Sequence, residues 1–390
     1  MPGGRGGAET AGTGLAAVWQ RWRDHRPATQ LLHLDSAAAG RSSAATLEAS
    51  AAVAAREAAV GASTAAVEVG PALDTGRAEL ARLLGVKPGG VAFVGSATAA
   101  LESLLSAWPL RPGDSVGVVP SEWGPNLAAF ERHGLRLVAL AVHGDGSIDL
   151  QGLAAVLTTD RPAFVHLTQV ASHRPLVQPV GAAAVLCRAA GVPLWVDAAQ
   201  AIGHVDTACG ADVLYATGRK WLTGPPDVGL LAVADRWWDA LRIRSPQGSS
   251  DELERESPVR LLESRDAAIS GRAGLCVAVG EYQDAGPEKV WQRLGEVGSL
   301  TRELLTGLPG WAVLEANGAP SAITAVRATS GQDIRETRAR LLAAHGIVTT
   351  AAEQDRAPWE MTEPLLRISP HVDCAVEDLL LLHEALIAAA

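Results

Sequence analysis

Between residues 90 and 235 the apolar positions form short continuous runs, and most runs are followed by a segment with apolar residues at helical spacing. The runs predict strands at 91–95, 114–119, 135–142, 163–170 and 193–197, and in the later segments "DVLYATG" and "VGLLAVA". The intervening segments "SATAALESLLSAW", "PNLAAFERHG" and "GAAAVLCRAAG" predict helices. Strands that are apolar throughout and alternate with helices are typical of a parallel sheet covered on both faces, so we expect an α/β fold.

The pattern changes after about residue 245. The segment "SPQGSSDELERESPVR" is polar and rich in serine and proline, which predicts an exposed connection. A helix-rich stretch follows, and then a mixed region that ends in the helix "AVEDLLLLHEALIAAA". We therefore expect a disordered tail at 1–14 and a segment at 15–54 that packs with the small domain. The large domain is expected at 55–245 and the small α/β domain at 246–390.

Length and charge restrict the possible partners. A chain of 390 residues is long enough for two domains. Its formal net charge is -10, and an acidic surface repels phosphate backbones, so nucleic acid is not an expected partner. No apolar run approaches the roughly 20 residues that span a bilayer, and the N-terminus lacks the basic start and apolar stretch of a signal peptide. We expect a cytoplasmic protein that binds no membrane.

The four cysteines do not indicate a metal site. None of them forms a C-x-x-C pair, so neither a zinc site nor a thioredoxin-like motif is predicted. Free thiols in a reducing compartment are the simpler interpretation. The cysteines are Cys187, Cys209, Cys276 and Cys374.

Lys220 is one of only three lysines among 33 basic residues. It follows the predicted strand "VLYATG" and precedes Trp221 and a Gly-Pro-Pro turn. An isolated lysine is usually a solvated charge, and Lys87 and Lys289 lie in polar settings of that kind. A lysine in a dry pocket has a lowered pKa and can form a Schiff base, and the apolar setting of Lys220 favours this role.

Asp197 closes the very apolar strand "PLWVD". A carboxylate in such a place is costly unless it is paired. It could cap a helix in "AAQAIGH", or it could be the counter-ion of a buried cation. Gln200, three residues further on, would share its face.

The segment "VGSATAALE" runs from a strand through glycine and hydroxyl residues into a helix. Free N–H groups at a helix start bind phosphate, although Ser96 would also serve as an ordinary N-cap. The glycine fingerprints of NAD-binding and P-loop proteins are absent, which disfavours a dehydrogenase. A phosphate-binding turn, an aspartate for a ring cation and a Schiff-base lysine together fit pyridoxal 5'-phosphate (PLP).

The segment "VDAAQAIGHVDTACGADVLYATGRKWLTGPPDVGLL" resembles the class V PLP-dependent enzymes, which include cysteine desulfurases, selenocysteine lyases, isopenicillin epimerases and related C–S lyases. The resemblance extends from "LLHLDSAAAG" (31–40) to "LLRISPHV" (365–372). It implies the PLP-dependent transferase fold, similar to aspartate aminotransferase, with a mostly parallel seven-stranded sheet and a smaller α/β C-terminal domain. Overall likeness within the family favours the actinobacterial C–S lyases of ergothioneine biosynthesis, which cleave hercynylcysteine S-oxide.

The resemblance implies roles around the cofactor. Lys220 would bond covalently to its aldehyde, Asp197 would contact the pyridinium nitrogen, and Gln200 would contact the ring hydroxyl. Arg219 departs from the family's Ser-x-His-Lys motif. The other cofactor contacts implied are Ser96, Ala97, Thr98 and Thr217 at the phosphate, Trp123 stacked on the ring where relatives have histidine, and Ser172 near the hydroxyl.

The resemblance also implies the substrate contacts and the assembly. Arg367 would clamp the α-carboxylate of an amino-acid substrate, and the other implied substrate contacts are Asp35, Ser36, Ala37 and His173. A trimethylammonium group would need an aromatic wall, for which Trp221 and Tyr215 are near in sequence. A homodimer with a composite active site is expected, with "AAISGRAG" (267–274) as a candidate contribution from the partner.

The activity implied is a β-elimination that yields a sulfenic acid, pyruvate and ammonia. Cysteine desulfurases need a nucleophilic cysteine on a mobile loop before the C-terminal arginine. Here the only cysteine between Lys220 and Arg367 is Cys276, in a segment that predicts a buried helix face. Desulfurase, selenocysteine lyase and amino-acid epimerase activities, and a non-catalytic binding protein, remain the alternatives.

Overall fold

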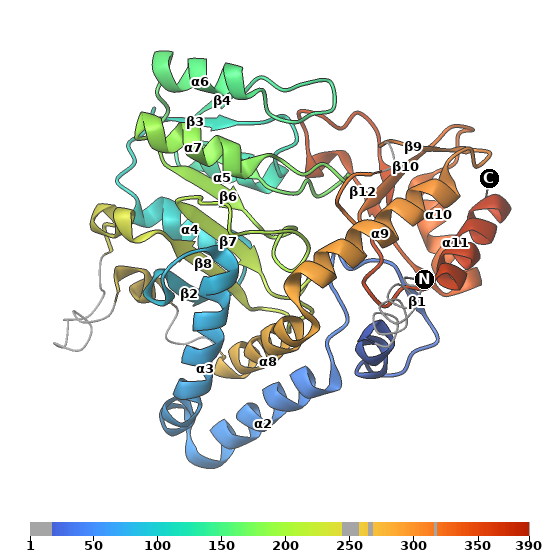
Figure 1. Ribbon diagram of the computed structural model, residues 1–390, viewed down its shortest axis with the longest axis horizontal. Coiled ribbons are helices and arrows are strands. Elements are labelled where there is room, and N and C mark those ends of the chain that lie inside the picture. The colour runs from blue at the N-terminus through green and yellow to red at the C-terminus, as the bar shows by residue number, and fades with distance from the viewer. Residues whose placement is uncertain (1–17, 244–256, 264–267, 316–317, 390) are drawn as a thin grey trace, which may run out of the picture.

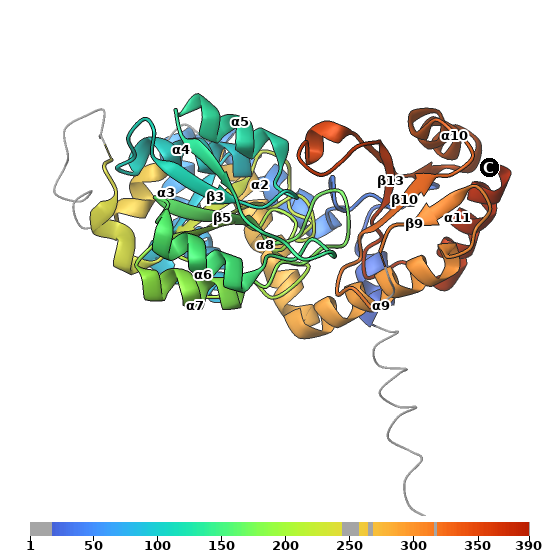
Figure 2. The same cartoon turned by 90° about the horizontal axis from the view of Figure 1, so that it is seen from above.

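The computed structural model describes residues 18–243, 257–263, 268–315 and 318–389. Figure 1 shows a larger unit built around one sheet and a smaller unit beside it, with α8 and α9 running between them. The two units also lie side by side in the view from above in Figure 2, so they do not merely overlap in one projection. The tail expected at 1–14 and most of the polar connection after residue 245 lie outside the described residues.

The larger unit contains a seven-stranded sheet in the order β2-β8-β7-β6-β5-β3-β4. β8 alone runs opposite to the other six strands, so the expectation of a mostly parallel sheet is confirmed. The connection from β7 to β8 contains no helix, and parallel strands need a longer crossover, which explains the reversal. The strands are β2 (Val91–Val94), β3 (Ser115–Val118), β4 (Arg136–Ala139), β5 (Phe164–Thr168), β6 (Leu194–Asp197), β7 (Val213–Thr217) and β8 (Gly229–Val233).

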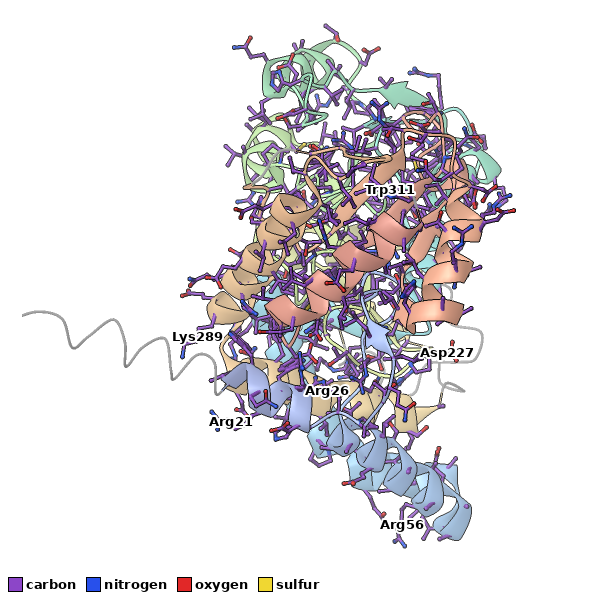
Figure 3. The ribbon with its side chains drawn as sticks, turned by 90° about the vertical axis from the view of Figure 1, so that its right-hand side faces the viewer. Arg21, Arg26, Arg56, Asp227, Lys289 and Trp311 are labelled. Atoms are coloured by element: carbon purple, nitrogen blue, oxygen red, sulfur yellow. The ribbon has the colours of Figure 1, made fainter. Side chains whose placement is uncertain are left out.

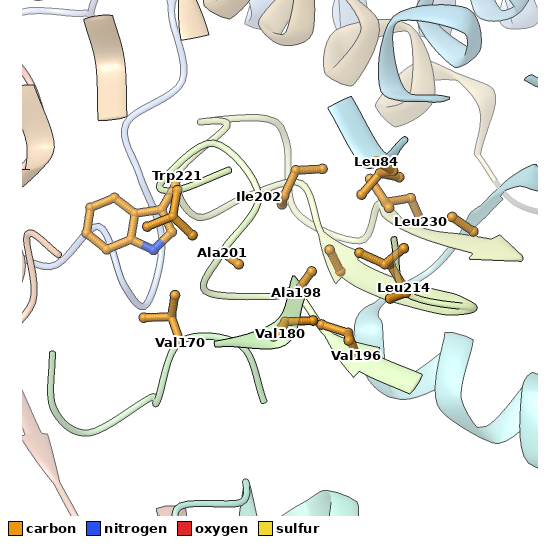
Figure 4. Packing of buried hydrophobic residues seen from close by; sticks show 14 of the residues in the cluster. Leu84, Val170, Val180, Val196, Ala198, Ala201, Ile202, Leu214, Trp221 and Leu230 are labelled. Carbon is orange, nitrogen blue, oxygen red and sulfur yellow. The ribbon is translucent and has the colours of Figure 1, made fainter. Parts of the chain in front are cut away.

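Alternate residues of the central strands pack into two different cores, one on each face of the sheet. On β6, Leu194 and Val196 join the core that includes α6 and α7, part of which is shown in Figure 4, whereas Trp195 joins the core with α4 and α5. Because both faces are covered, each strand reads as one continuous apolar run. The covering helices are α4 (Ala97–Ala107), α5 (Gly124–Arg132), α6 (Leu150–Thr159) and α7 (Val180–Ala190).

The smaller unit is an antiparallel sheet in the order β12-β13-β10-β9, backed by three helices. Its separate core includes Leu341, Leu366 and Leu382. The strands are β9 (Trp311–Val313), β10 (Thr324–Ala328), β12 (Thr350–Ala352) and β13 (Leu365–Ile368). The helices are α9 (Pro287–Leu305), α10 (Ile334–His345) and α11 (Val376–Ala388).

The N-terminal part of the chain touches both units. Strand β1 (Leu32–His33) pairs in parallel with β11 (Ile347–Val348) of the smaller unit. Helices α2 (Ala44–Val60), α3 (Ala62–Leu84) and α8 (Ile269–Ala285) pack against one another and project from the molecule, with Arg56 near the tip in Figure 3. Among the described residues, no helix is both long and apolar enough to cross a bilayer.

Candidate active site

A cavity of about 210 Å³ lies where β5, β6 and β7 end and α4 begins. The carboxyl ends of parallel strands form the usual ligand crevice of such a sheet. All ten residues predicted to contact the cofactor line this cavity: Ser96, Ala97, Thr98, Trp123, Ser172, Asp197, Gln200, Thr217, Arg219 and Lys220. The cavity is also lined by residues that the sequence did not single out: Gly95, Asn126, Thr168, Ala199, Asp227 and Arg356.

Asp197 is a buried carboxylate at the end of β6. Its Oδ1 accepts from the N–H of Ala199 at 2.8 Å, and its Oδ2 accepts from Nδ2 of Asn126 at 3.0 Å. The segment after it forms turns rather than the helix considered as an alternative, so Asp197 is not a helix cap. Burial raises its pKa despite both N–H donors, and no ion pair to it is found in the described part of the chain. Such a carboxylate is suited to a cation supplied by a ligand.

A buried polar network lies behind Asp197. The Glu122 carboxylate accepts from Asn126 Nδ2 at 2.9 Å and from Thr168 Oγ1 at 2.6 Å, and its Oε2 lies 2.8 Å from Nδ1 of His166. His166 Nε2 in turn lies 2.8 Å from the Tyr215 hydroxyl. Burial alone would raise the pKa of Glu122, but His166 and the hydrogen bonds of Thr168 and Asn126 bring it below its usual value. Asn126 therefore donates to two carboxylates at once.

Replacing Asn126 by leucine is expected to lower the free energy of unfolding by about 2–4 kcal/mol. The substitution removes the donor shared by two buried carboxylates, so the repulsion between Glu122 and Asp197 is no longer offset by it. Chemical denaturation of the purified variant measures the loss. Adding Glu122→Gln to the Asn126→Leu variant removes one of the two charges and should restore part of the stability. If the two substitutions instead lower the free energy of unfolding additively, Asn126 does not act by serving both carboxylates.

Lys220 follows β7, and its pKa is lowered to about 7, mainly by burial and in addition by Arg367, Arg219 and Arg356, against the attraction of Asp197. A large fraction of its amine is therefore neutral near pH 7 and available as a nucleophile or base. None of the other described lysines lies in the cavity: Lys87 and Lys289 are exposed, and Lys289 stands at the outer edge in Figure 3.

The pKa of Lys220 predicts how apoprotein combines with PLP. Because only the neutral amine attacks an aldehyde, the rate should rise with pH and reach half its maximum near pH 7. An unperturbed lysine would place that midpoint near pH 10.5. Stopped-flow absorbance after mixing apoprotein and PLP measures the profile, and a rate still climbing above pH 9 would contradict it.

The start of α4 forms the other end of the cavity. Ser96 is the N-cap, and its hydroxyl accepts from the N–H of Ala99 at 3.0 Å. The N–H groups of Ala97 and Thr98 have no partner within the helix and remain for an anion. Gly229 of β8 allows this approach, since a Cβ there would lie 2.8 Å from the carbonyl carbon of Ser96. Thr217 and Arg219 line the same cavity, which agrees with a phosphate-binding cup.

Gln200 and Trp221 are already bonded to the protein. Gln200 Nε2 donates to the Ala37 carbonyl at 2.7 Å, and its Oε1 accepts from Trp221 Nε1 at 2.8 Å. One amide hydrogen of Gln200 remains for the predicted contact with a ring hydroxyl. Trp221 is fully buried and stacks on His204, and it lies within the apolar core in Figure 4. Neither Trp221 nor Tyr215 lines the cavity, so neither offers the aromatic wall considered from the sequence.

The residues predicted to contact the substrate do not line the cavity, unlike those predicted to contact the cofactor. None of Asp35, Ser36, Ala37, His173 and Arg367 belongs to the cavity lining. Arg367 is fully buried and donates to the Ser172 carbonyl at 2.8 Å and to Asp35 Oδ1 at 3.1 Å. To clamp a carboxylate, Arg367 would have to exchange Asp35 for the substrate, and this role remains a prediction.

None of the four cysteines lines the cavity within the described part of the chain. Cys276 lies in α8, as expected, and burial raises the pKa of its thiol to about 11. Burial likewise raises the pKa of Cys374, which is buried before α11. Thiols with raised pKa values are poor nucleophiles, so the site offers no persulfide-forming cysteine.

Comparisons with known proteins agree with this geometry. The family model of the class-V aminotransferases matches residues 32–379. The chain belongs to the class-V aminotransferase family. Over 386 residues, it is 44% identical to the probable hercynylcysteine sulfoxide lyase of Mycobacterium tuberculosis, covering 99% of this chain and 96% of that protein.

More distant members of the family also match. The chain is 29% identical over 330 residues to the isopenicillin N epimerase of Amycolatopsis lactamdurans, covering 77% of this chain and 81% of that protein. The apo structure of a cysteine desulfurase from Thermococcus onnurineus superposes with a TM-score of 0.83 at 19% identity, covering 95% of this chain and 97% of that chain. The class-V aminotransferase fold expected from the sequence is thus confirmed.

The donor set of the cavity fits PLP. A helix N-terminus with Thr217 and Arg219 suits a phosphate, the unpaired Asp197 suits a ring cation, and Lys220 with its lowered pKa suits an aldehyde. Trp123 lines the cavity as a flat apolar surface for a ring. The expectation of a PLP cofactor therefore holds at the level of chemistry.

Proposed function

We propose that this class-V aminotransferase-family protein is a PLP-dependent C–S lyase that acts on hercynylcysteine sulfoxide. The observation that carries the proposal is the 44% identity over 99% of the chain to a probable hercynylcysteine sulfoxide lyase. The cavity supports it, because Lys220 and Asp197 line one space that fits PLP. The products would be a sulfenic acid, pyruvate and ammonia.

When bound, PLP supplies an aldehyde for covalent attachment and a ring that withdraws electrons from the substrate's Cα. The neutral amine of Lys220 takes the Cα proton as general base, which its pKa of about 7 permits. Asp197 holds a proton on the ring nitrogen, and Asn126 fixes the orientation of that carboxylate. The electron pair of the Cα–H bond forms a Cα=Cβ double bond, and the Cβ–S pair leaves with the sulfur as a sulfenate. The released enamine takes up one water, which breaks its C–N bond and gives pyruvate and ammonia.

An elimination of this kind needs no nucleophilic thiol. A desulfurase differs in this respect, because it needs a thiolate beside the substrate sulfur. The raised pKa values of Cys276 and Cys374, and their absence from the cavity lining, disfavour the desulfurase alternative in the described part of the chain.

Pyruvate release tests the proposal. Holoenzyme should release pyruvate from hercynylcysteine sulfoxide far faster than from cysteine, cystine or selenocysteine, as followed by a coupled lactate dehydrogenase assay. Release of sulfide or alanine from cysteine at a comparable rate would support a desulfurase instead. Racemised amino acid without pyruvate would support an epimerase.

The proposal includes a homodimer in the cytoplasm. The projecting helices α2 and α3 expose apolar side chains, among them Leu47 and Val67, the latter with 79% of its surface exposed. Exposed apolar surface of this kind is typical of an interface. Sedimentation of the holoenzyme should give twice the 40.4 kDa chain mass, and a monomer would remove the composite active site from the proposal.

A further inference from the structure

Arg356 is the one arginine of the smaller unit that lines the cavity within the described part of the chain. It ends the short η4 helix (Gln354–Arg356), and its guanidinium carbon lies 5.5 Å from the centroid of the Trp123 ring. Arg356 is among the groups that lower the pKa of Lys220, so its charge acts on the reacting lysine. Arg356 therefore stands over the surface on which the cofactor ring is expected.

The donors of Arg356 are available to a ligand. Among the described residues, its guanidinium makes no hydrogen bond or ion pair; it lies over the Trp123 ring and is attracted at longer range by Asp35, Asp355 and Glu353. Arg367, by contrast, is fully buried and already donates to Ser172 and Asp35. A ligand that enters the cavity meets Arg356 without displacing a protein partner, whereas Arg367 must first release Asp35.

The segment that carries Arg356 is held in place from several sides. The carbonyl oxygen of Asp355 lies so close to Gly124, at the start of α5, that a Cβ on residue 124 would clash with it. Further along the segment, Glu360 forms an ion pair with Arg174 and lies 3.4 Å from Nε2 of His173. These two residues follow Ser172, which lines the cavity. The backbone that carries Arg356 is thus positioned before any ligand arrives.

We propose that Arg356 binds a substrate oxygen that carries negative charge in the bound state or gains it during the reaction, and so selects for substrates with such an oxygen near the reacting carbons. The inference deepens the proposed function and rests on it. Two groups near the reacting carbons qualify: the α-carboxylate, which is an anion, and the S-oxide, whose oxygen is polarised but neutral in the substrate. An S-oxide leaves as a sulfenate, with negative charge on its oxygen, and a guanidinium donor stabilises that charge as the Cβ–S bond breaks.

Binding to two probes tests the inference. L-Alanine carries the α-carboxylate but no leaving group, and the α-methyl analogue of hercynylcysteine sulfoxide carries both groups but no Cα proton. Titration of holoenzyme by visible absorbance or calorimetry gives a dissociation constant for each. The variant Arg356→Gln should weaken at least one of them by about 10- to 100-fold. Arg356→Lys keeps the charge and should recover part of the loss, and Arg340→Gln, exposed on α10, is the matched control.

The two probes separate the sources of the oxygen. Weaker binding of both assigns Arg356 to the α-carboxylate, and weaker binding of the S-oxide analogue alone assigns it to the leaving group. In the second case kcat should also fall on the S-oxide while the matching thioether is turned over as by the unsubstituted enzyme. Dissociation constants that stay unchanged for both probes overturn the inference.

The test remains valid if the proposed function fails. Should the unsubstituted enzyme neither bind nor cleave the S-oxide, the proposed function is wrong, and the L-alanine constant alone then decides on Arg356. Gly124→Ala supplies a second variant in which Arg356 is retained but the η4 segment is pushed away. It should weaken the same probe as Arg356→Gln, and unchanged binding in both variants would overturn the positioning argument.

Discussion

Replacing Lys220 by alanine should abolish turnover, with a loss of more than about 10⁴-fold. The variant loses both the amine that bonds to the cofactor aldehyde and the base that takes the Cα proton. No second described lysine lies in the cavity to replace it. The pyruvate assay measures the loss, and the visible absorption band of the lysine–cofactor linkage should vanish with it.

Lys289→Ala is the matched control for this experiment. Lys289 is exposed near the start of α9, and its removal should leave both the rate and the spectrum unchanged. A Lys220→Ala enzyme that retains even a tenth of the activity would refute the assignment of Lys220 as base and cofactor-binding residue.

Replacing Asp197 by asparagine should lower kcat by about 10²- to 10⁴-fold while the fold persists. A neutral amide cannot hold a proton on the ring nitrogen, so the ring becomes a weaker electron sink. The asparagine would also turn its NH₂ group toward either Asn126 Nδ2 or the Ala199 N–H. Both of these groups are donors, so one hydrogen bond of Asp197 would be lost. Weaker retention of PLP during dialysis should accompany the loss of rate.

A chemically identical change elsewhere controls for the substitution itself. Asp149→Asn alters the N-cap of α6, which does not belong to the cavity lining, and should leave kcat unchanged. Near-normal turnover of Asp197→Asn with fully retained PLP would rule out the role at the ring nitrogen.

The strands of the larger unit were predictable because both faces of the sheet are covered. Every residue of β5 and β6 is buried, so the apolar runs are continuous and mark the strands directly. A polar residue at the end of such a run stands out, as Asp197 does, and Lys220 stands out because lysine is scarce in this chain. The carboxyl ends of parallel strands meet at one edge, and the ten residues predicted to contact the cofactor do line one cavity there.

The residues missed from the sequence are those whose partners are distant in the chain. Glu122 contacts Thr168 and His166 over more than forty positions, and Asn126 reaches Asp197 across 71. A glutamate and an asparagine beside a tryptophan carry no local signal of such burial. The direction of β8 was also not specified by its composition, since an apolar strand reads the same in either direction.

The sequence by itself determined the fold class, the strands of the larger unit with the helices α4, α5 and α7, and the lysine and aspartate of the candidate site, because burial imposes a local pattern on each strand. It did not predict α6 or the separate strands of the smaller unit. Only the tertiary structure decided which charged side chains face the cavity. It withdrew Arg367 into a contact with Asp35 and placed Arg356 over Trp123. The physical reason is that the surroundings of a charged side chain are set by contacts between units far apart in the sequence, which no local pattern records.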